Sequence, residues 1–239
     1  SSVPQQPRPS PPPMLWCALY LPDLALQTFT RGRGDGPPLA ILSDRPRQKV
    51  VAVDAAAMAR GVAAGQSCAS ALALAPDLCL IERDPHRELA TLTDIACWAG
   101  RFTPALSLAP PDTLLLEIHA SLRLFGGLAS LGTAIHAGLE ELGFFGQLAV
   151  APTPLAARWL ARAAAGRLVE TPADLPAALD PLPLAILAEG GRLGADSLDL
   201  LDGIGARRLA DVRSLPRSGL ARRHAQAASD LLDRAYGLV

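Results

Sequence analysis

The chain has 239 residues, of which 50% are hydrophobic, so it is long enough for one large domain or two to three small ones. Its 22 basic and 23 acidic side chains nearly cancel, which excludes a global field that would attract a polyanion. Any contact with nucleic acid must therefore come from a local patch. No uninterrupted apolar run reaches the roughly 18 residues needed to cross a bilayer, so we expect no membrane contact.

The cysteines and histidines do not indicate a metal centre or a disulfide frame. The four cysteines lie far apart, mostly within apolar runs, and the four histidines show no ligand spacing with them. We therefore expect reduced, buried thiols in a cytoplasmic protein, with no metal and no cofactor. The positions are Cys17, Cys68, Cys79, Cys97, His86, His119, His136 and His224.

The first third of the chain predicts a disordered tail followed by short strands and helices. Residues 1–13 are rich in Pro, Gln and Ser and have no basic segment ahead of an apolar core, which is typical of a tail and not of a secretory signal. An apolar run that ends at Pro22 indicates a buried strand, and Asp54 and Ser67 are suitable N-cap residues. The expected elements are strands at 15–21, 39–42 and 50–53, and helices at 54–60 and 67–74.

The middle of the chain predicts a βαββαβ sheet of the ferredoxin-like type. Apolar residues recur at three- and four-residue steps from 86 to 100, including Leu89, which indicates an amphipathic helix. The expected elements that follow are a hairpin of strands at 104–109 and 113–119, a helix at 128–142, a strand at 145–151 and a helix at 154–165. Together with the first strand, this order gives an α+β fold class.

The last third predicts helices and a possible DNA contact. Residues 167–185 are a Pro-punctuated connector, and 186–239 show no strand pattern, so we place a domain boundary near 166. Residues 200–213 read LLDGIGARRLADVR, the pattern of a helix-hairpin-helix. Gly203 and Gly205 around Ile204 permit a turn with amide groups near a phosphate, and Arg207 and Arg208 begin the next helix.

We expect this hairpin to bind the DNA backbone independently of base sequence. From residue 207 to residue 223, six arginines outnumber a single aspartate, a net charge of +5. They are Arg207, Arg208, Arg213, Arg217, Arg222 and Arg223, against Asp211. A glycine C-cap followed by an ordinary solvated helix would give the same residues, and that interpretation stays open.

Four segments resemble, in the right order, the core of the Y-family (translesion) DNA polymerases. They are the first strand and residues 51–65, 110–127 and 149–160, and the most specific piece is the run from Arg123 to Gly126 (RLFG). The resemblance covers about residues 14–239. It implies a palm at 14–22 and 85–166, inserted α/β fingers at 23–84 and an all-helical thumb at 167–239 with the helix-hairpin-helix. Because the sequence ends at Val239, we expect the family's little finger to be absent.

The departures from this family concern the catalytic acids. Tyr20 stands where the resemblance implies the first catalytic Asp, Asp112 where it implies the second, and Thr113 where it implies the adjacent Glu. Two-metal phosphoryl transfer needs carboxylates from both strands, and one cannot hold two Mg²⁺ ions. Asp112 by itself also suits a turn after Pro110 and Pro111.

The substrate side departs from the family as well. Ala55 and Met58 occupy the positions of the Tyr and Arg that grip the triphosphate, and Thr153 and Pro154 occupy those of an Asn-Lys pair. Losing these groups removes the cationic clamp on the nucleotide. Glu117 lies where the family also has an acidic residue, and we expect its role to be structural.

Such a core resembles the ImuB-type, catalytically inactive branch of the family. The resemblance implies a non-catalytic accessory protein in damage-induced mutagenesis, with DNA, a RecA-like ImuA-type protein, a C-family DNA polymerase and the sliding clamp as partners. Two alternatives stay open: an active Y-family polymerase whose acids are misaligned, with Asp23 as a candidate, and a protein-interaction scaffold without DNA binding.

Overall fold

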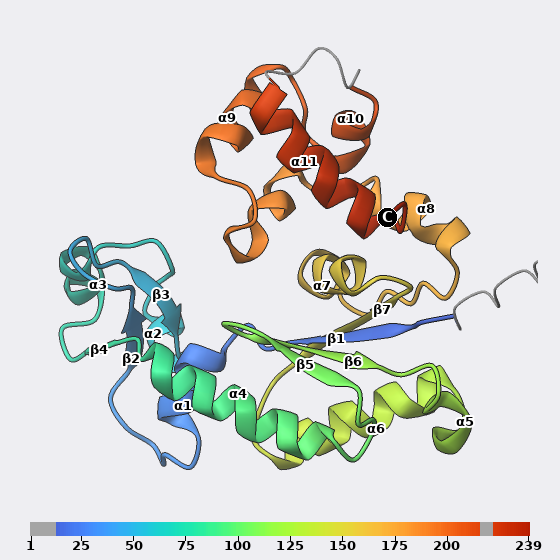
Figure 1. Ribbon diagram of the computed structural model, residues 1–239. Coiled ribbons are helices and arrows are strands. Elements are labelled where there is room, and N and C mark those ends of the chain that lie inside the picture. Colours follow the sequence, from blue (N-terminus) through green and yellow to red (C-terminus); the bar gives the residue numbers. More distant parts are fainter. Residues whose placement is uncertain (1–12, 216–221) are drawn as a thin grey trace, which may run out of the picture.

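A four-stranded antiparallel sheet lies at the centre of the computed structural model, which describes residues 13–215 and 222–239 (Figure 1). Its strand order is β5-β6-β1-β7. The strands are β1 (Trp16–Tyr20), β5 (Leu106–Ala109), β6 (Thr113–Glu117) and β7 (Gln147–Ala151). With a helix in each crossover, this is the ferredoxin-like arrangement that the sequence predicts.

Side chains of the central strand alternate between two cores, as the pleat of a strand requires. Cys17 and Leu19 pack against α4 (Pro85–Ala99) and α6 (Leu128–Glu141), whereas Ala18 and Tyr20 face α7 (Pro154–Ala163). Figure 1 shows α4 and α6 on one side of the sheet and α7 on the other. The sheet therefore separates two apolar layers.

A second, three-stranded sheet is inserted after β1. It consists of β2 (Leu39–Leu42), β3 (Val50–Val53) and β4 (Cys79–Glu82) in the order β3-β2-β4, with α1 (Leu24–Thr30), α2 (Ala55–Ala59) and α3 (Cys68–Leu74) around it. The Asp54 carboxylate accepts from the Ala57 amide at 2.8 Å, and the Ser67 hydroxyl accepts from the Ser70 amide at 3.2 Å. Both predicted N-caps are confirmed.

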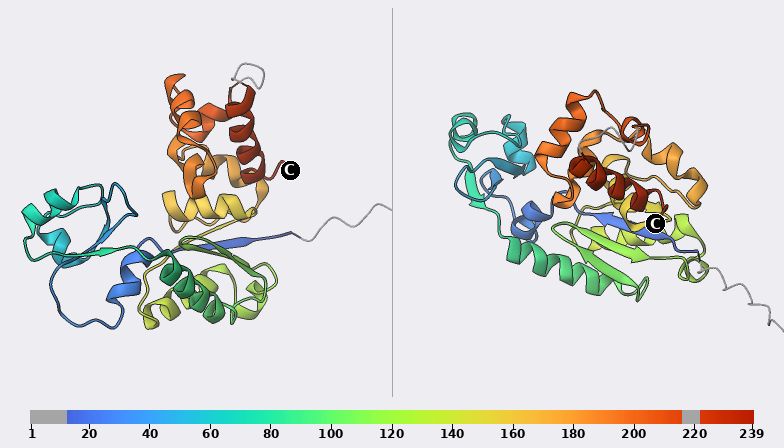
Figure 2. Two further views of the ribbon diagram at one scale, coloured as in Figure 1. Left: turned by 60° about the vertical axis from the view of Figure 1, so that its left-hand side comes forward. Right: turned by 45° about the horizontal axis from the view of Figure 1, so that its top comes forward.

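The C-terminal third is helical and covers the outer side of α7 (Figure 2). Its elements are η1 (Pro172–Asp174), α8 (Leu175–Leu179), η2 (Leu184–Gly191), α9 (Ala195–Gly203), α10 (Leu209–Arg213) and α11 (Arg222–Ala235). Every residue of α7 from Leu155 to Ala161 is consequently buried, because the helix is covered on two sides. Helix α7 is the shared middle layer of the molecule.

Several expectations need correction. Three short elements were not expected: helix α1, strand β4 and helix α5 (Leu122–Phe125). Strand β4 is stabilised by parallel pairing with the distant β2, which no local pattern indicates. Leu89, expected on the apolar face of its helix, is 43% exposed, while Glu88 is buried beside Arg83. The supposed connector begins by pairing with β7, since the Val150 amide donates to the Arg167 carbonyl at 2.9 Å.

Two further expectations concern the tail and membranes. The expected tail, except for Pro13, lies outside the described residues. Within residues 13–215 and 222–239, no helix combines the length and the apolar composition that a membrane crossing requires. The α+β fold class is confirmed.

Because α7 is covered on two sides, substitutions at a buried and at an exposed position of this helix should change the free energy of unfolding by different amounts. Ala157 is fully buried and Ala163 is exposed, so a leucine at 157 must displace neighbours on a packed surface. We expect Ala157→Leu to lower the free energy of unfolding by about 1–3 kcal/mol. Ala163→Leu is the matched control and should change it by less than about 0.5 kcal/mol. Urea denaturation measures both, and equal effects would contradict the two-sided packing of α7.

Candidate functional site

Three of the residues singled out in the sequence meet at one end of the four-stranded sheet. Tyr20 and Thr113 are directly opposite each other in the β1–β6 register, and Asp112 immediately precedes β6. The Leu21 amide donates to the Asp112 carbonyl at 2.8 Å, which holds the two chains together beyond the strand ends. Tyr20 packs on the α7 side of the sheet, and Thr113 is buried.

A guanidinium group that the sequence analysis missed lies among them. Arg162, near the end of α7, pairs with the Asp112 carboxylate, and its Nη2 donates to Thr113 Oγ1 at 3.3 Å. Its Cζ is 4.0 Å from the centre of the Tyr20 ring, a cation–π contact. The Thr113 hydroxyl in turn donates to Asp112 Oδ1 at 3.0 Å. All three predicted positions therefore contact one cation.

The other side of this guanidinium contacts the C-terminal helical part. Arg162 Nε donates to Glu189 Oε1 at 3.1 Å, and Arg158, one helical turn earlier, pairs with the same carboxylate. The Glu189 side chain is only 4% exposed. The four-residue spacing of Arg158 and Arg162 on an otherwise apolar helix was the available signal, since it puts both cations on one face. Nothing in the sequence pointed to Glu189.

The chemistry of this site differs from that of a two-metal centre. Two Mg²⁺ ions require several carboxylate oxygens facing them, whereas here the single carboxylate at the three positions, Asp112, is already paired with Arg162. A phenol and a threonine hydroxyl carry no charge at neutral pH. In the part of the chain that the structure describes, no group of three or more His, Cys, Asp or Glu side chains could hold a metal ion. The residues present do not fit the metal pair.

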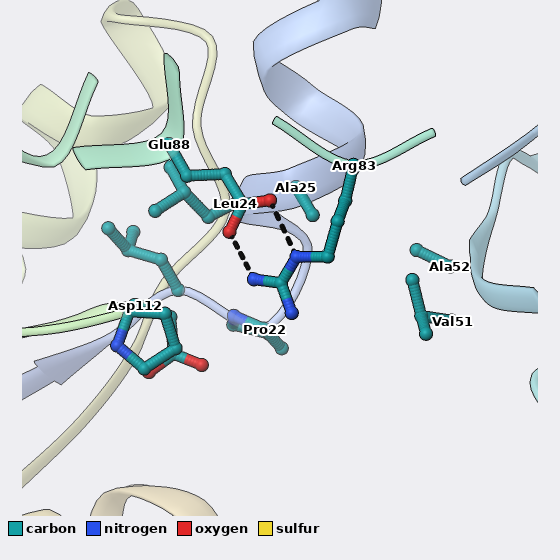
Figure 3. Close-up of a pocket in the computed structure, with 10 residues that line it drawn as sticks. Pro22, Leu24, Ala25, Val51, Ala52, Arg83, Glu88 and Asp112 are labelled. Carbon is teal, nitrogen blue, oxygen red and sulfur yellow. Dashed lines mark hydrogen bonds and ion pairs between the residues drawn. The ribbon is translucent and has the colours of Figure 1, made fainter. Parts of the chain in front are cut away.

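A cavity of about 190 Å³ opens beside Asp112, between the two sheets. Val51 and Ala52 line it from β3, and Arg83 and Glu88 lie between them and Asp112 in the view of Figure 3. Arg83 forms two hydrogen bonds with the buried Glu88 carboxylate, one from Nε at 3.1 Å. The cation that faces this cavity is therefore already matched by an anion.

The expected nucleotide-contacting positions do not form a cationic clamp. Ala55 and Met58 lie on α2 and are exposed, Met58 by 64%, and neither side chain carries a charge or a hydrogen-bond donor. Pro154 is the first residue of α7 and has no amide hydrogen. The preceding Thr153 is an N-cap, with its hydroxyl accepting from the Ala156 amide at 3.2 Å and donating to the Ala235 carbonyl at 2.7 Å.

The other two acids considered in the sequence are Asp23 and Glu117. Asp23 is the N-cap residue of α1, after β1 has ended, and its side chain makes no capping hydrogen bond. One Glu117 oxygen accepts from the Leu15 amide at 3.2 Å and from the His119 amide at 3.1 Å. Glu117 thus joins the two strand ends at the end of the sheet opposite Asp112, which is consistent with the predicted structural role.

The turn between α9 and α10 carries the residues expected to contact DNA. Gly205 has a φ of +92°, which suits glycine, and Ile204 is 51% exposed. The amides of 204–206 donate to carbonyls of α9, and those of Arg207 and Arg208 donate to Asp211 Oδ2 at 2.8 and 2.9 Å. These two hydrogen bonds lower the pKa of Asp211. A phosphate contact here therefore depends on the guanidinium groups.

The positive charge of this region is smaller than the sequence count suggests. Arg207 pairs with Asp202, and Arg213 pairs with Asp180 at 2.8 Å. Arg208 is exposed and has no ion pair with the described residues. Arg217, and the side chains of Arg222 and Arg223, lie outside the described part of the chain.

The two sheets and their helices define a protein with the fold of the Y-family polymerases. The fold matches the crystal structure of DinB from Sulfolobus solfataricus, with a TM-score of 0.71 and 20% identity over 94% of this chain and 67% of that chain. It also matches the insertion ternary complex of Dbh DNA polymerase, with a TM-score of 0.73 and 19% identity over 95% of this chain and 68% of that chain. At these identities the likeness establishes the fold, including the palm and fingers arrangement.

The chain belongs to the impB/mucB/samB family, whose model matches residues 31–162. It is 36% identical over 177 residues to the protein ImuB of Caulobacter vibrioides (strain NA1000 / CB15N), covering 74% of this chain and 38% of that protein. It is 27% identical over 211 residues to DNA polymerase IV of Escherichia fergusonii, covering 84% of this chain and 61% of that protein. The chain thus spans less than two thirds of the length of each of these relatives.

The surroundings of Tyr20 predict an unusual titration. Burial raises the pKa of Tyr20 above its ordinary value of 10.0, opposed by the nearby Arg162 and reinforced by Asp112 and Asp23. Because the folded pKa is the higher one, the stabilisation is present below pH 10 and is lost as the pH rises through the folded pKa. The protein has two tyrosines, so Tyr236→Phe leaves only this signal. We expect tyrosinate absorbance in that variant to rise above pH 10, and a midpoint at or below 10 would contradict the buried ion-paired site.

Proposed function

We propose that this protein is a non-catalytic, polymerase-like accessory protein of damage-induced mutagenesis, one that binds the DNA backbone and helps to assemble a lesion-bypass complex. In this proposal residues 14–22 and 85–166 are the palm, 23–84 the fingers and 167–239 the thumb, whose turn at Gly203–Gly205 is a helix-hairpin-helix. What supports it is membership of the family together with 36% identity to an ImuB protein.

One observation carries the loss of catalysis: the Asp112 carboxylate is paired with Arg162 beside two uncharged hydroxyl groups. If Tyr20 and Thr113 stand at the family's catalytic positions, the site has one acid where two metal ions need several. The substrate side has lost its clamp too, because Ala55, Met58 and Pro154 offer no positive charge. Nucleotide transfer then has neither its metals nor its electrostatic support.

In the proposed DNA contact the arginines of the α9–α10 turn carry the interaction. Arg208 is exposed and free of an ion pair within the described residues, so its guanidinium is available to a phosphate. Arg207 can exchange its exposed pair with Asp202 at small cost, since surface ion pairs contribute little. The contact is with the sugar-phosphate backbone and does not depend on base sequence.

The proposed partners follow from kinship with ImuB and not from an interface. They are a RecA-like ImuA-type protein, a C-family DNA polymerase that performs the synthesis, and the sliding clamp, with the cytoplasm as the location. The internally bonded amides of the turn favour a second candidate function, an interaction scaffold that does not bind DNA. Binding measurements separate the two.

The proposed loss of catalysis predicts the result of a primer-extension assay. With primer-template DNA, nucleotides and either Mg²⁺ or Mn²⁺, we expect no templated incorporation, because the residues around Asp112 do not suit two metal ions. Primer extension on a gel measures it, with an Asp112→Ala variant purified identically as the control for contaminating polymerase. Incorporation by the unaltered protein that Asp112→Ala abolishes would establish an active polymerase and end this proposal.

The proposed backbone contact predicts how the DNA affinity depends on salt. We expect binding that weakens with salt, and Arg208→Ala should reduce the slope of log K against log [salt] by about one, the contribution of one phosphate contact. Fluorescence anisotropy with labelled primer-template DNA measures this. Arg101→Ala is the matched control, because Arg101 is exposed just after α4, on the opposite side of the sheet from α7. A DNA affinity that changes neither with Arg208→Ala nor with ionic strength would favour the interaction scaffold.

A further inference from the structure

Carboxylates from two distant segments hold Arg162. Its Nη2 pairs with Asp112, 50 positions earlier in the chain, and its Nε donates to Glu189, 27 positions later. The Tyr20 ring covers the guanidinium at 4.0 Å, and Thr113 accepts from it at 3.3 Å. The side chain is 17% exposed, so this cation is fixed from several sides and largely removed from water.

The backbone around Glu189 places its carboxylate at this point. Residues Leu184–Gly191 contain a kink, with Glu189 at φ −53° and ψ 127° and Gly190 at φ +67°, the left-handed region that favours glycine. Besides Arg162, the carboxylate pairs with Arg158, which is also buried, and Arg192 Nε lies 3.7 Å from its second oxygen. One anion therefore compensates three guanidinium groups.

The cluster as a whole carries an excess of positive charge. Arg158, Arg162 and Arg192 contribute three positive charges against two negative charges from Asp112 and Glu189, a net charge of +1. Burial lowers the pKa of Arg192, and the charge of Arg158 lowers it further. A divalent cation approaching Asp112 would meet this excess where little water screens it.

We infer that Arg162 is a built-in cation that takes the place of a divalent metal beside Asp112, and that Glu189 is the positioning residue that holds it there. The site then excludes metal ions by occupancy and charge, in addition to lacking ligands. Restoring acids at positions 20 and 113 does not restore metal binding while Arg162 is present. The inference rests on the proposed function in one respect, that Tyr20 and Thr113 stand where the family's carboxylates stand.

Mn²⁺ binding to rebuilt sites tests the occupancy. The double variant Tyr20→Asp/Thr113→Glu supplies three carboxylates with Arg162 intact, and adding Arg162→Gln removes the cation while keeping a shorter, polar and uncharged side chain. We expect the triple variant to bind Mn²⁺ at least about tenfold more tightly than the double variant. Electron paramagnetic resonance of free Mn²⁺ measures this, with circular dichroism to show that each variant is folded.

A charge-preserving variant provides the control. In the rebuilt background Arg162→Lys keeps a positive charge at the site and should leave Mn²⁺ binding as weak as with arginine. If the Arg162→Gln protein does not fold, Mn²⁺ binding is compared between Arg162→Lys and Arg162→Met, both in the rebuilt background. Equal Mn²⁺ affinity with and without the cation overturns the inference.

The positioning role of Glu189 has its own spectroscopic test. The Arg162 Nε–H donates to Glu189, so its hydrogen exchange should be slow, and its NMR signal is assigned by its disappearance in Arg162→Lys. We expect Glu189→Gln to accelerate this exchange about tenfold or more, because an amide accepts a weaker hydrogen bond than a carboxylate. Glu88→Gln alters the separate Arg83–Glu88 pair and should leave the exchange rate of the Arg162 Nε–H unchanged. Equal effects of the two variants overturn the positioning role.

The outcomes separate this inference from the proposed function. Nucleotide incorporation by the unaltered protein would defeat the proposed function, and it is measured without any substitution at Arg162. Equal Mn²⁺ binding by the rebuilt variants, combined with an unaltered protein that incorporates no nucleotide, would defeat the inference alone.

Discussion

One partly buried guanidinium connects the four-stranded sheet with the C-terminal helices. Arg162 contacts Asp112, Thr113 and Tyr20 on the sheet side and Glu189 on the helical side. A charge removed from water is strongly unfavourable unless it is paired and hydrogen-bonded, so these contacts depend on one another. Through these contacts the cation joins the sheet end, α7 and the kinked segment around Glu189.

This interaction also links the fold to the proposed loss of catalysis. Two-metal phosphoryl transfer at this sheet end would require several negative oxygens facing the metal ions. Here the local balance is reversed, since the cluster around Glu189 has a net positive charge. In the proposed function the family scaffold is retained for binding and its chemistry is lost, which is physically consistent because fold and reaction depend on different residues.

Much of the architecture followed from local patterns. Apolar runs predicted β2 and β3 with their observed bounds, and Asp54 and Ser67 located the starts of α2 and α3, because strand periodicity and N-caps depend only on neighbouring residues. Strand β4 was not expected, since three half-buried residues and one exposed residue become a strand only by pairing with the distant β2. The prediction that Leu89 lies on the buried face of its helix was wrong. Hydrophobic periodicity cannot show that Glu88 is buried instead, because that burial depends on its pair with Arg83.

The sequence by itself, through its resemblance to the Y-family core, indicated which groups stand at the sheet end, namely Tyr20, Asp112 and Thr113. Their side-chain chemistry can be read without knowing their partners. Only the tertiary structure decided what faces them. Arg162 and Glu189 meet Asp112 through the stacking of α7 between the sheet and the C-terminal helices, over separations that no local pattern encodes. Electrostatic partners come from three-dimensional packing, and composition cannot specify them.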